Sequence, residues 1–318
     1  MDPISHVIFG RTLVALDRRG RLGAGAIAAA VLGALAPDID ALAAWNGWDV
    51  YLRMHEIGTH SVVGSVATGA TAGTLVYFLK RSARCASLAV AGTAGALSHV
   101  AFDVVSGAHI RLAWPLFEHR ASLPLVAMAD PWLIAICAIG ALGLWAFRRR
   151  AFIVATVVIG TIAAFLSVKG VLMALAVPKW RVATSADTIA NHVVEASWSS
   201  LTEWTVADRT PLALRKWRID AVRAPTLVLT IPLRADSPVI AASRSLQTVR
   251  NFLHVHDLGF ALVTPLGQET LVLWSDIRYC SSSTECALWF GGVFDRNGGA
   301  VRQVVRVGQW QQSRPVSP

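Results

Sequence analysis

Three long apolar runs most constrain what this chain can fold into. They cover residues 61–79, 86–105 and 152–177. The hydrocarbon core of a bilayer is about 30 Å thick, so a helix needs roughly 20 largely apolar residues to cross it. Each run comes close to that length, and only 15% of the chain is charged, against about 25% in soluble proteins. The sequence therefore predicts a multi-pass membrane protein.

Three weaker apolar segments decide how many helices cross the membrane. Residues 131–147 are slightly short but uncharged, and residues 22–36 are shorter still and rich in Ala and Gly. Small residues allow such a helix to pack closely against its neighbours. Residues 4–16 contain two ionisable side chains and are the weakest candidate. We therefore expect a membrane α-helical bundle of five to six transmembrane helices within residues 1–177.

The apolar pattern changes near Val177 and Pro178, where we place a domain boundary. Turn signals separate short apolar or alternating runs, a pattern typical of antiparallel strands. These runs lie at residues 216–222, 226–231, 259–264, 270–274, 287–294 and 301–307. Residues 178–318 should thus form a small α+β domain, mainly an antiparallel sheet.

Further features of this domain are expected from local pattern. Residues 183–204 are predicted to form a helix, and His254 and His256 are predicted to alternate on a strand. Cys280 and Cys286 flank a short polar loop. They could close a disulfide in an oxidising compartment, a question that the sequence leaves open.

Basic residues fall in alternate loops between the apolar segments. The three clusters are Arg18, Arg19 and Arg21; Lys80, Arg81 and Arg84; and Arg148, Arg149 and Arg150. By the positive-inside rule, all three can face the cytoplasm together. The remaining loops and the C-terminal domain then lie outside. The net charge is +9, but no dense basic stripe carries interleaved aromatic residues. Nucleic acid is therefore not expected as a partner, whereas membrane lipid is.

Histidine and aspartate residues fall at the outer ends of these segments in this topology. They are His6, Asp38, Asp40, His55, His60, His99, Asp103 and His109. His99 and Asp103 are separated by one helical turn, so they share a helix face. Imidazole with carboxylate suits Zn²⁺ best, with Mn²⁺ or Fe²⁺ as alternatives.

Each motif alone has a simpler interpretation. The Asp38–Asp40 segment could be a helix-exit turn, and an i,i+4 His/Asp pair is more often a hydrogen-bonded pair than a metal site. Ionisable groups beside membrane spans are costly, however, and they usually mark function. Their convergence on one predicted face favours a metal site. Such a site can hold a water and lower its pKa, which gives a nucleophile near neutral pH.

Four motifs together resemble the YdjM-like family of inner-membrane metal-dependent hydrolases, described as LexA-binding or LexA-regulated. The motifs are Met-Asp-Pro-Ile-Ser-His6, Pro-Asp-Ile-Asp40, His55-Glu-Ile-Gly-Thr-His60 and Ser-His99-Val-Ala-Phe-Asp103. Trp114-Pro115 and Trp274-Ser-Asp-Ile-Arg-Tyr279 also look like segments of this family.

That family is distantly similar to zinc-dependent phospholipase C and the S1/P1-type nucleases. The resemblance implies that His6, Asp38 or Asp40, His60, His99, Asp103 and His109 bind metal. It also implies a bacterial cytoplasmic-membrane location. Glu56 stands where a basic residue would be expected, so it is an added ligand or a general base. A further His-x-x-x-Glu pair is lacking, which favours one or two ions over three.

The sequence thus predicts a metal-dependent hydrolase of phosphoesters, lipids among them, with Asp38 and Glu56 as catalytic carboxylates. The alternative is a non-enzymatic membrane protein. In that case the metal is structural or sensory, and the external domain binds a protein partner. A transporter ranks third, because its ionisable residues would be expected at the membrane midplane.

Overall fold

The computed structural model describes residues 2–81, 84–184, 189–233 and 237–315. The chain divides into two compact units. We call the first the helical unit; it comprises Met1–Ala41, His55–Ala176 and Glu195–Trp204. We call the second the sheet unit; it comprises Leu42–Met54, Val177–Val194 and Thr205–Pro318.

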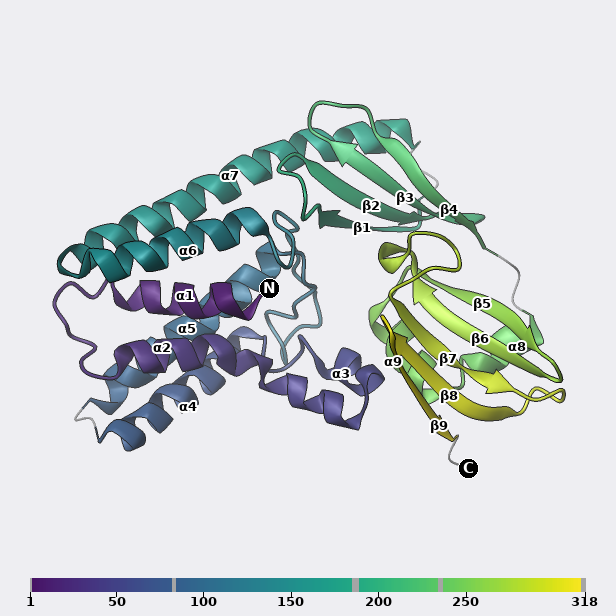
Figure 1. The fold of residues 1–318 in the computed structure, drawn as a ribbon, viewed down its shortest axis with the longest axis horizontal. Helices are drawn as coiled ribbons and strands as arrows, with labels where there is room; N and C mark the ends of the chain where they lie inside the picture. Colours follow the sequence, from purple (N-terminus) through teal and green to yellow (C-terminus); the bar gives the residue numbers. More distant parts are fainter. Residues whose placement is uncertain (1, 82–83, 185–188, 234–236, 316–318) are drawn as a thin grey trace. The chain divides into compact units, whose positions relative to one another are not determined.

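Helices dominate the N-terminal half of the chain (Figure 1). They are α1 (Pro3–Val14), α2 (Ala26–Leu35), the 3-10 helix η1 (Ala36–Asn46), α3 (Trp48–Met54), α4 (Val62–Lys80), α5 (Cys85–Val105), α6 (Pro131–Ala146), the 3-10 turn η2 (Arg148–Arg150) and α7 (Ala151–Ala183). Asp2 caps α1, since its carboxylate accepts a hydrogen bond from the Ser5 N–H at 2.9 Å. Pro3 at the first helical position favours the same start, and this start places His6 within the first two turns.

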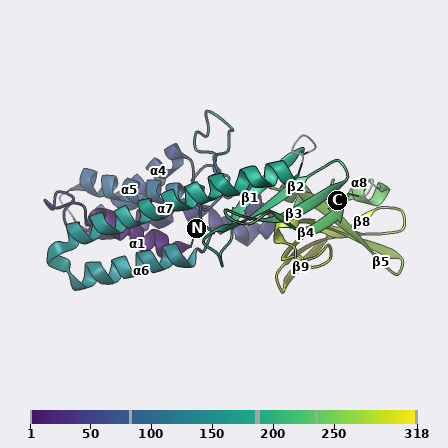
Figure 2. The same cartoon turned by 90° about the horizontal axis from the view of Figure 1, so that it is seen from above.

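Within the described residues, four helical segments are long and apolar enough to cross a membrane. They are Ala26–Asn46, in which α2 continues into η1, and Val62–Lys80, Cys85–Val105 and Arg148–Ala183. Helix α6 is apolar but shorter, and it packs antiparallel to α7 through Gly140 and Val158 (Figure 2). The predicted helical N-terminal part with several apolar candidate spans is therefore confirmed, while the expected count of five to six crossings stays a prediction.

Glycine lets α2, α4 and α5 approach each other closely. A Cβ placed on Gly33 would collide with the Gly92 carbonyl oxygen, and a Cβ on Gly92 would collide with the Gly69 carbonyl oxygen. Helices that pack with so little space between them gain van der Waals contact, which is the main attraction between helices in lipid. This tight packing holds the ends of α2 and α5 in register, where candidate ligands lie.

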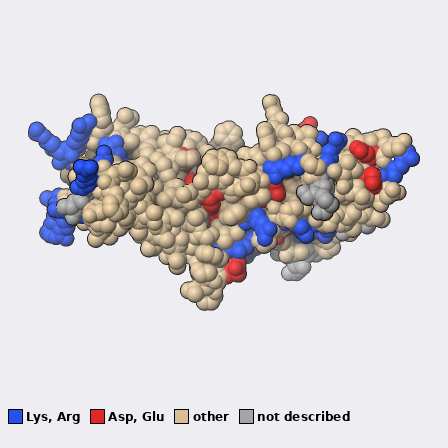
Figure 3. Space-filling view, turned by 90° about the horizontal axis from the view of Figure 1, so that it is seen from below, with Lys and Arg blue, Asp and Glu red and all other residues tan. Residues whose placement is uncertain are grey.

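The basic clusters meet at one end of the helical unit. Arg84 donates a hydrogen bond to the Arg21 carbonyl oxygen at 2.7 Å, and the Arg18 guanidinium lies 5.9 Å from the centre of the Phe152 ring. These contacts join the α1–α2 loop to the α4–α5 loop and to the start of α7. Lys and Arg side chains gather at this end in the space-filling view (Figure 3).

Lys169, the one charge within the long apolar run of α7, is buried inside the helical unit. Its Nζ donates to the Leu201 carbonyl oxygen at 3.1 Å and lies 4.4 Å from the centre of the Trp204 ring. Trp204 in turn donates from Nε1 to the Pro124 carbonyl oxygen at 2.8 Å. Partners within the protein thus satisfy a cation that would be costly against lipid.

The described C-terminal part of the chain forms two sheets rather than the single small sheet predicted. The first has the order β1-β2-β3-β4, and the second has the order β5-β6-β7-β8-β9 with antiparallel pairing throughout. The strands are β1 (Asn191–Ala196), β2 (Glu203–Arg209), β3 (Ala213–Asp220), β4 (Thr226–Pro232), β5 (Gly259–Leu266), β6 (Glu269–Asp276), β7 (Leu288–Phe294), β8 (Ala300–Val307) and β9 (Trp310–Pro315). Two short helices, α8 (Pro238–Ser243) and α9 (Gln247–Val255), precede β5. Phe252 of α9 stacks on Phe290 of β7 with the ring centres 4.8 Å apart.

Two local predictions in this part are wrong. The helix expected over residues 183–204 is absent from the described residues, because α7 ends at Ala183 and β1 and β2 follow. His254 and His256 do not alternate on a strand, since α9 extends to Val255. Val249 and Phe252 are both buried, and their spacing of three residues is helical.

Cys280 and Cys286, whose pairing the sequence leaves open, form a disulfide.

Candidate metal centre

Three side chains form a nearly equilateral triangle of ligand atoms. Asp38 Oδ1 lies 3.4 Å from His60 Nε2 and 3.4 Å from His99 Nε2, and the two nitrogens are 3.2 Å apart. Ligand atoms about 2.0–2.1 Å from a tetrahedral Zn²⁺ lie about 3.3 Å from one another. The triangle therefore has the dimensions of three corners of a zinc site, and Asp103 Oδ2 lies beside it, 3.6 Å from His60 Nε2.

A backbone carbonyl holds His99 in the required orientation. Its Nδ1 lies 2.7 Å from the Ala34 carbonyl oxygen, at the end of α2. A carbonyl only accepts, so Nδ1 donates to it and Nε2 is the nitrogen that faces the triangle. This is the outer contact that most metal-binding histidines make. The close packing of α2 on α5 makes it possible.

Asp40 lies behind the triangle and orients two histidines. Its Oδ1 lies 2.8 Å from His55 Nδ1, and its Oδ2 lies 3.2 Å from His60 Nδ1. Oδ2 also accepts from the Thr59 hydroxyl at 3.0 Å and from the Glu56 N–H at 3.3 Å. Four donors occupy the two oxygens, so the geometry favours Asp40 as a positioning residue rather than a ligand.

Charge around His60 favours its protonated form in the metal-free protein. Burial alone would lower the pKa of His60, but the carboxylates of Asp38 and Asp40 outweigh it and raise the pKa to about 9. An incoming cation would take the place of that proton between the same carboxylates. The site is thus built to hold one positive charge.

Asp103 and His6 extend the group on the other side of His99. Asp103 Oδ2 lies 2.9 Å from His99 Nε2, while Asp103 Oδ1 lies 3.4 Å from His6 Nε2. The His6 ring stacks on His99 with centres 3.9 Å apart. His6 is fully buried; its Nδ1 has no hydrogen-bond partner in the described structure, and its Nε2 has only the long contact with Asp103. Buried polar atoms are nearly always satisfied, so His6 fits a second ion beside Asp103.

Glu56 lies next to this cluster in an unusual backbone conformation. Its φ is 64°, a left-handed value uncommon for a residue with a Cβ, and such values concentrate at functional sites. Burial raises the pKa of its carboxyl above the usual value, although His55 opposes the shift. Its Oε1 lies 4.0 Å from His55 Nε2, and its side chain is 28% exposed. A carboxyl in such a setting can take up a proton.

The structure brings together most of the residues predicted from sequence. Three overlapping ligand groups form, each with atoms within 4.8 Å of one another: His6, His99 and Asp103; Asp38, His60 and His99; Asp40, His55 and His60. His109 belongs to none of these groups within the described chain; it lies in the loop after α5. Sequence reasoning missed the parts played by Thr59 and the Ala34 carbonyl, since neither is an ionisable side chain.

Comparison with known proteins identifies the family. The profile of the YdjM inner membrane protein family matches residues 1–175, more than half of the chain. No curated protein and no solved structure matches it. The matched range contains all of the candidate ligands, and the chain belongs to the YdjM inner membrane protein family.

Proposed function

We propose that this protein is a membrane-bound metal-dependent hydrolase of phosphoesters, with lipid phosphoesters as the first candidates. One observation carries the proposal: the triangle of Asp38 Oδ1, His60 Nε2 and His99 Nε2 has edges of 3.2–3.4 Å. Three protein ligands with one spare position are the arrangement of catalytic rather than structural zinc sites.

The proposed roles follow from contacts and exposure. Asp38, His60 and His99 would hold one ion, and His6 with Asp103 would hold a second. Asp38 and Glu56 are the carboxylates of this cluster with notable solvent access, at 33% and 28% of the side chain. They are therefore the two that substrate and water would reach.

A bound Zn²⁺, Mn²⁺ or Fe²⁺ would lower the pKa of a water and polarise an ester oxygen. The raised pKa of Glu56 suits it to accept the proton that this water loses. Asp40 would keep His60 in the tautomer whose Nε2 faces the ion, because His60 Nδ1 donates to it. The protein thus supplies the ligands, their orientation and a proton acceptor.

The location of the cluster supports a substrate at the outer membrane surface. The candidate ligands lie at the start of α1, after α2, before α4 and at the end of α5. The basic loops join the opposite ends of these same helices. The positive-inside rule would put the basic end in the cytoplasm and the cluster at the outer face of the inner membrane, near lipid headgroups.

Metal analysis and hydrolysis assays test the proposal. The full chain in detergent micelles, loaded with Zn²⁺, would be assayed on bis(p-nitrophenyl) phosphate and on phospholipid vesicles. We expect His60→Ala and Asp38→Asn to lose both metal and activity, with His119→Ala as an exposed control. Wild-type protein that binds no transition metal would rule out the proposal.

A second candidate is a structural or sensory metal site in a protein without enzymatic activity. Burial favours it, because the His60 and His99 side chains are only 0% and 1% exposed. Protein that loads metal in full, depends on His60 for it, yet hydrolyses none of the substrates would support this function instead.

A further inference from the structure

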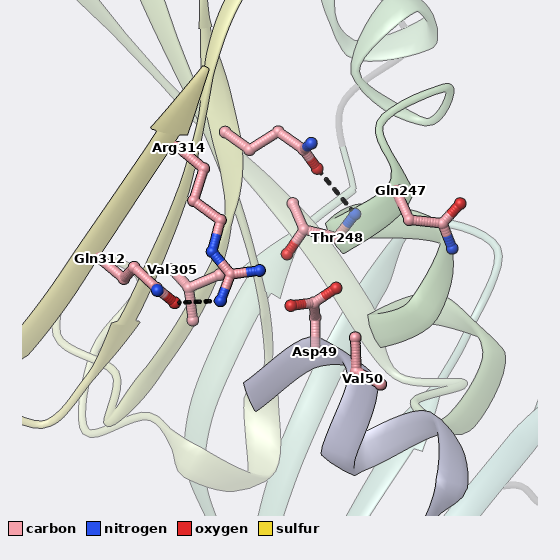
Figure 4. A pocket seen from close by; sticks show the side chains of 8 residues that line it. Asp49, Val50, Gln247, Thr248, Val305, Gln312 and Arg314 are labelled. Carbon is pink, nitrogen blue, oxygen red and sulfur yellow. Dashed lines mark hydrogen bonds between the residues drawn. The ribbon is translucent and has the colours of Figure 1, made fainter. Parts of the chain in front are cut away.

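A small cavity in the sheet unit is separate from the metal centre. It lies where α3, the start of α9 and strands β8 and β9 meet (Figure 4). Its volume is about 140 Å³. Asp49, Thr248 and Arg314 are among the residues that line it. Two opposite charges and a hydroxyl thus share one small space.

The two charges lie close together without forming an ion pair. A Cβ at Gly47 would lie 2.8 Å from Asp49 Oδ1 and 2.9 Å from Arg314 Nη2, so both charged groups border the same small region beside Gly47. No ion pair joins them in the described part of the chain. Asp49 is 7% exposed, and its Oδ2 accepts from Asn251 Nδ2 at 2.9 Å.

Arg314 is already held in place by neighbours. Its Nη1 donates to the Asn46 carbonyl oxygen at 2.8 Å, and its Nη2 donates to Gln312 Oε1 at 2.9 Å. A guanidinium has five N–H donors, so donors remain for a ligand. The arginine is therefore oriented before any ligand arrives, which reduces the entropy lost on binding.

Thr248 supplies an independent sign of a ligand. Its side chain is 2% exposed, and its Oγ1 has no hydrogen-bond partner in the described structure. Its backbone N–H is satisfied, since it donates to Gln303 Oε1 at 3.0 Å. Figure 4 shows the hydroxyl directed toward the space between Asp49 and Arg314. A buried hydroxyl without a partner is costly, and a ligand in the cavity would satisfy it.

We propose that this cavity binds a small α-amino acid of about the size of alanine. Its ammonium would donate to Asp49, and its carboxylate would accept from Arg314 and Thr248. In an α-amino acid the ammonium nitrogen and the carboxylate carbon are separated by only two bonds, so both charged groups of such a ligand fit within one small cavity that Asp49 and Arg314 line. A cavity of about this volume holds about six non-hydrogen atoms. Val50 and Val305 line the same cavity and would contact a methyl side chain.

Calorimetric titration of the full chain in detergent micelles with L-alanine tests this proposal. We expect saturable binding of glycine, alanine or serine. Acetate and ethylamine, which each lack one charge, and leucine, which is too large, should not bind. Binding of ethylamine or acetate as tight as that of alanine would overturn the assignment of a zwitterion, as would no binding of any small amino acid.

Variants connect binding to the cavity. Thr248→Val keeps the shape and removes the hydroxyl, and Arg314→Gln removes the cation; each should weaken alanine binding about 10- to 100-fold. Arg302→Gln, an exposed arginine of β8, is the matched control and should bind alanine as the wild type does. Asp49→Asn is a third variant. Its thermal unfolding temperature, compared with that of the wild type, shows whether a loss of alanine binding in this variant comes from unfolding. Unchanged affinity in Thr248→Val and Arg314→Gln would refute the proposal.

Discussion

Metal affinity should depend steeply on pH because His60 holds a proton in the metal-free protein. Its pKa is raised to about 9, so below that pH an incoming ion must displace the proton. Displacing one proton changes the apparent affinity tenfold, or about 1.4 kcal/mol, for each pH unit. We therefore expect Zn²⁺ affinity to fall at least 100-fold between about pH 8 and pH 6, and to level off above pH 9.

Competition between the protein and a chelating dye measures this dependence. Calorimetry in two buffers of different ionisation enthalpy counts the protons released per ion. At pH 7 we expect at least one proton, contributed by His60. Affinity that is unchanged between about pH 6 and pH 8, with no proton release, would refute the assignment of His60 as a ligand.

The Asp40→Asn variant distinguishes the residue that sets the pH dependence of metal affinity from the ligand His60. Asp40 raises the pKa of His60 and accepts from its Nδ1. The variant should therefore bind Zn²⁺ about 10- to 100-fold more weakly at pH 8. It should also show a shallower pH profile, because less of His60 is protonated. Loss of an outer contact predicts this combination, whereas loss of a direct ligand predicts near-complete loss of metal.

Three further predictions concern stability and are measured by thermal unfolding of the full chain in detergent. Gly92→Ala should destabilise the protein by about 1–3 kcal/mol, because its Cβ would collide with the backbone of α4. Gly160→Ala is the control: open space surrounds Gly160, so this change should be neutral or stabilising. Equal effects of the two changes would contradict the close-packing argument. Replacing Cys280 and Cys286 together by Ser should cost about 2 kcal/mol, because the disulfide closes a short loop, and wild-type protein in reductant should match the double variant. Burial, and after it Arg278, lower the pKa of His256 to about 4. Between about pH 6.5 and pH 4 the unfolded chain therefore binds a proton at His256 that the folded protein does not, and stability should fall by up to about 3 kcal/mol as the pH drops through this range. A His256→Gln variant with the same pH dependence of stability would contradict this.

The candidate ligands could be predicted because helix ends carry strong sequence signals. Apolar length marks where each membrane helix stops, and His99 and Asp103 share a face through their spacing alone. The roles within the cluster could not be predicted. Asp38 and Asp40 look equivalent in the sequence, and only three-dimensional contacts show that four donors surround Asp40 while Asp38 faces His60 and His99.

The segment Leu42–Met54 shows a deeper limit of the sequence pattern. It lies between Asp40 and His55, which are joined by a contact of 2.8 Å in the helical unit, yet it packs within the sheet unit. Its anchor is the hydrogen bond from Asn251 to Asp49, across 202 positions of sequence, and no local periodicity can reveal such a partner. The chain leaves the metal centre at Asp40 and returns to it at His55, so the segment between these two residues belongs by its contacts to one unit and by its flanking residues to the other. The sheet unit is therefore connected through the backbone to two residues of the metal centre, although it contributes no ligand to the three groups.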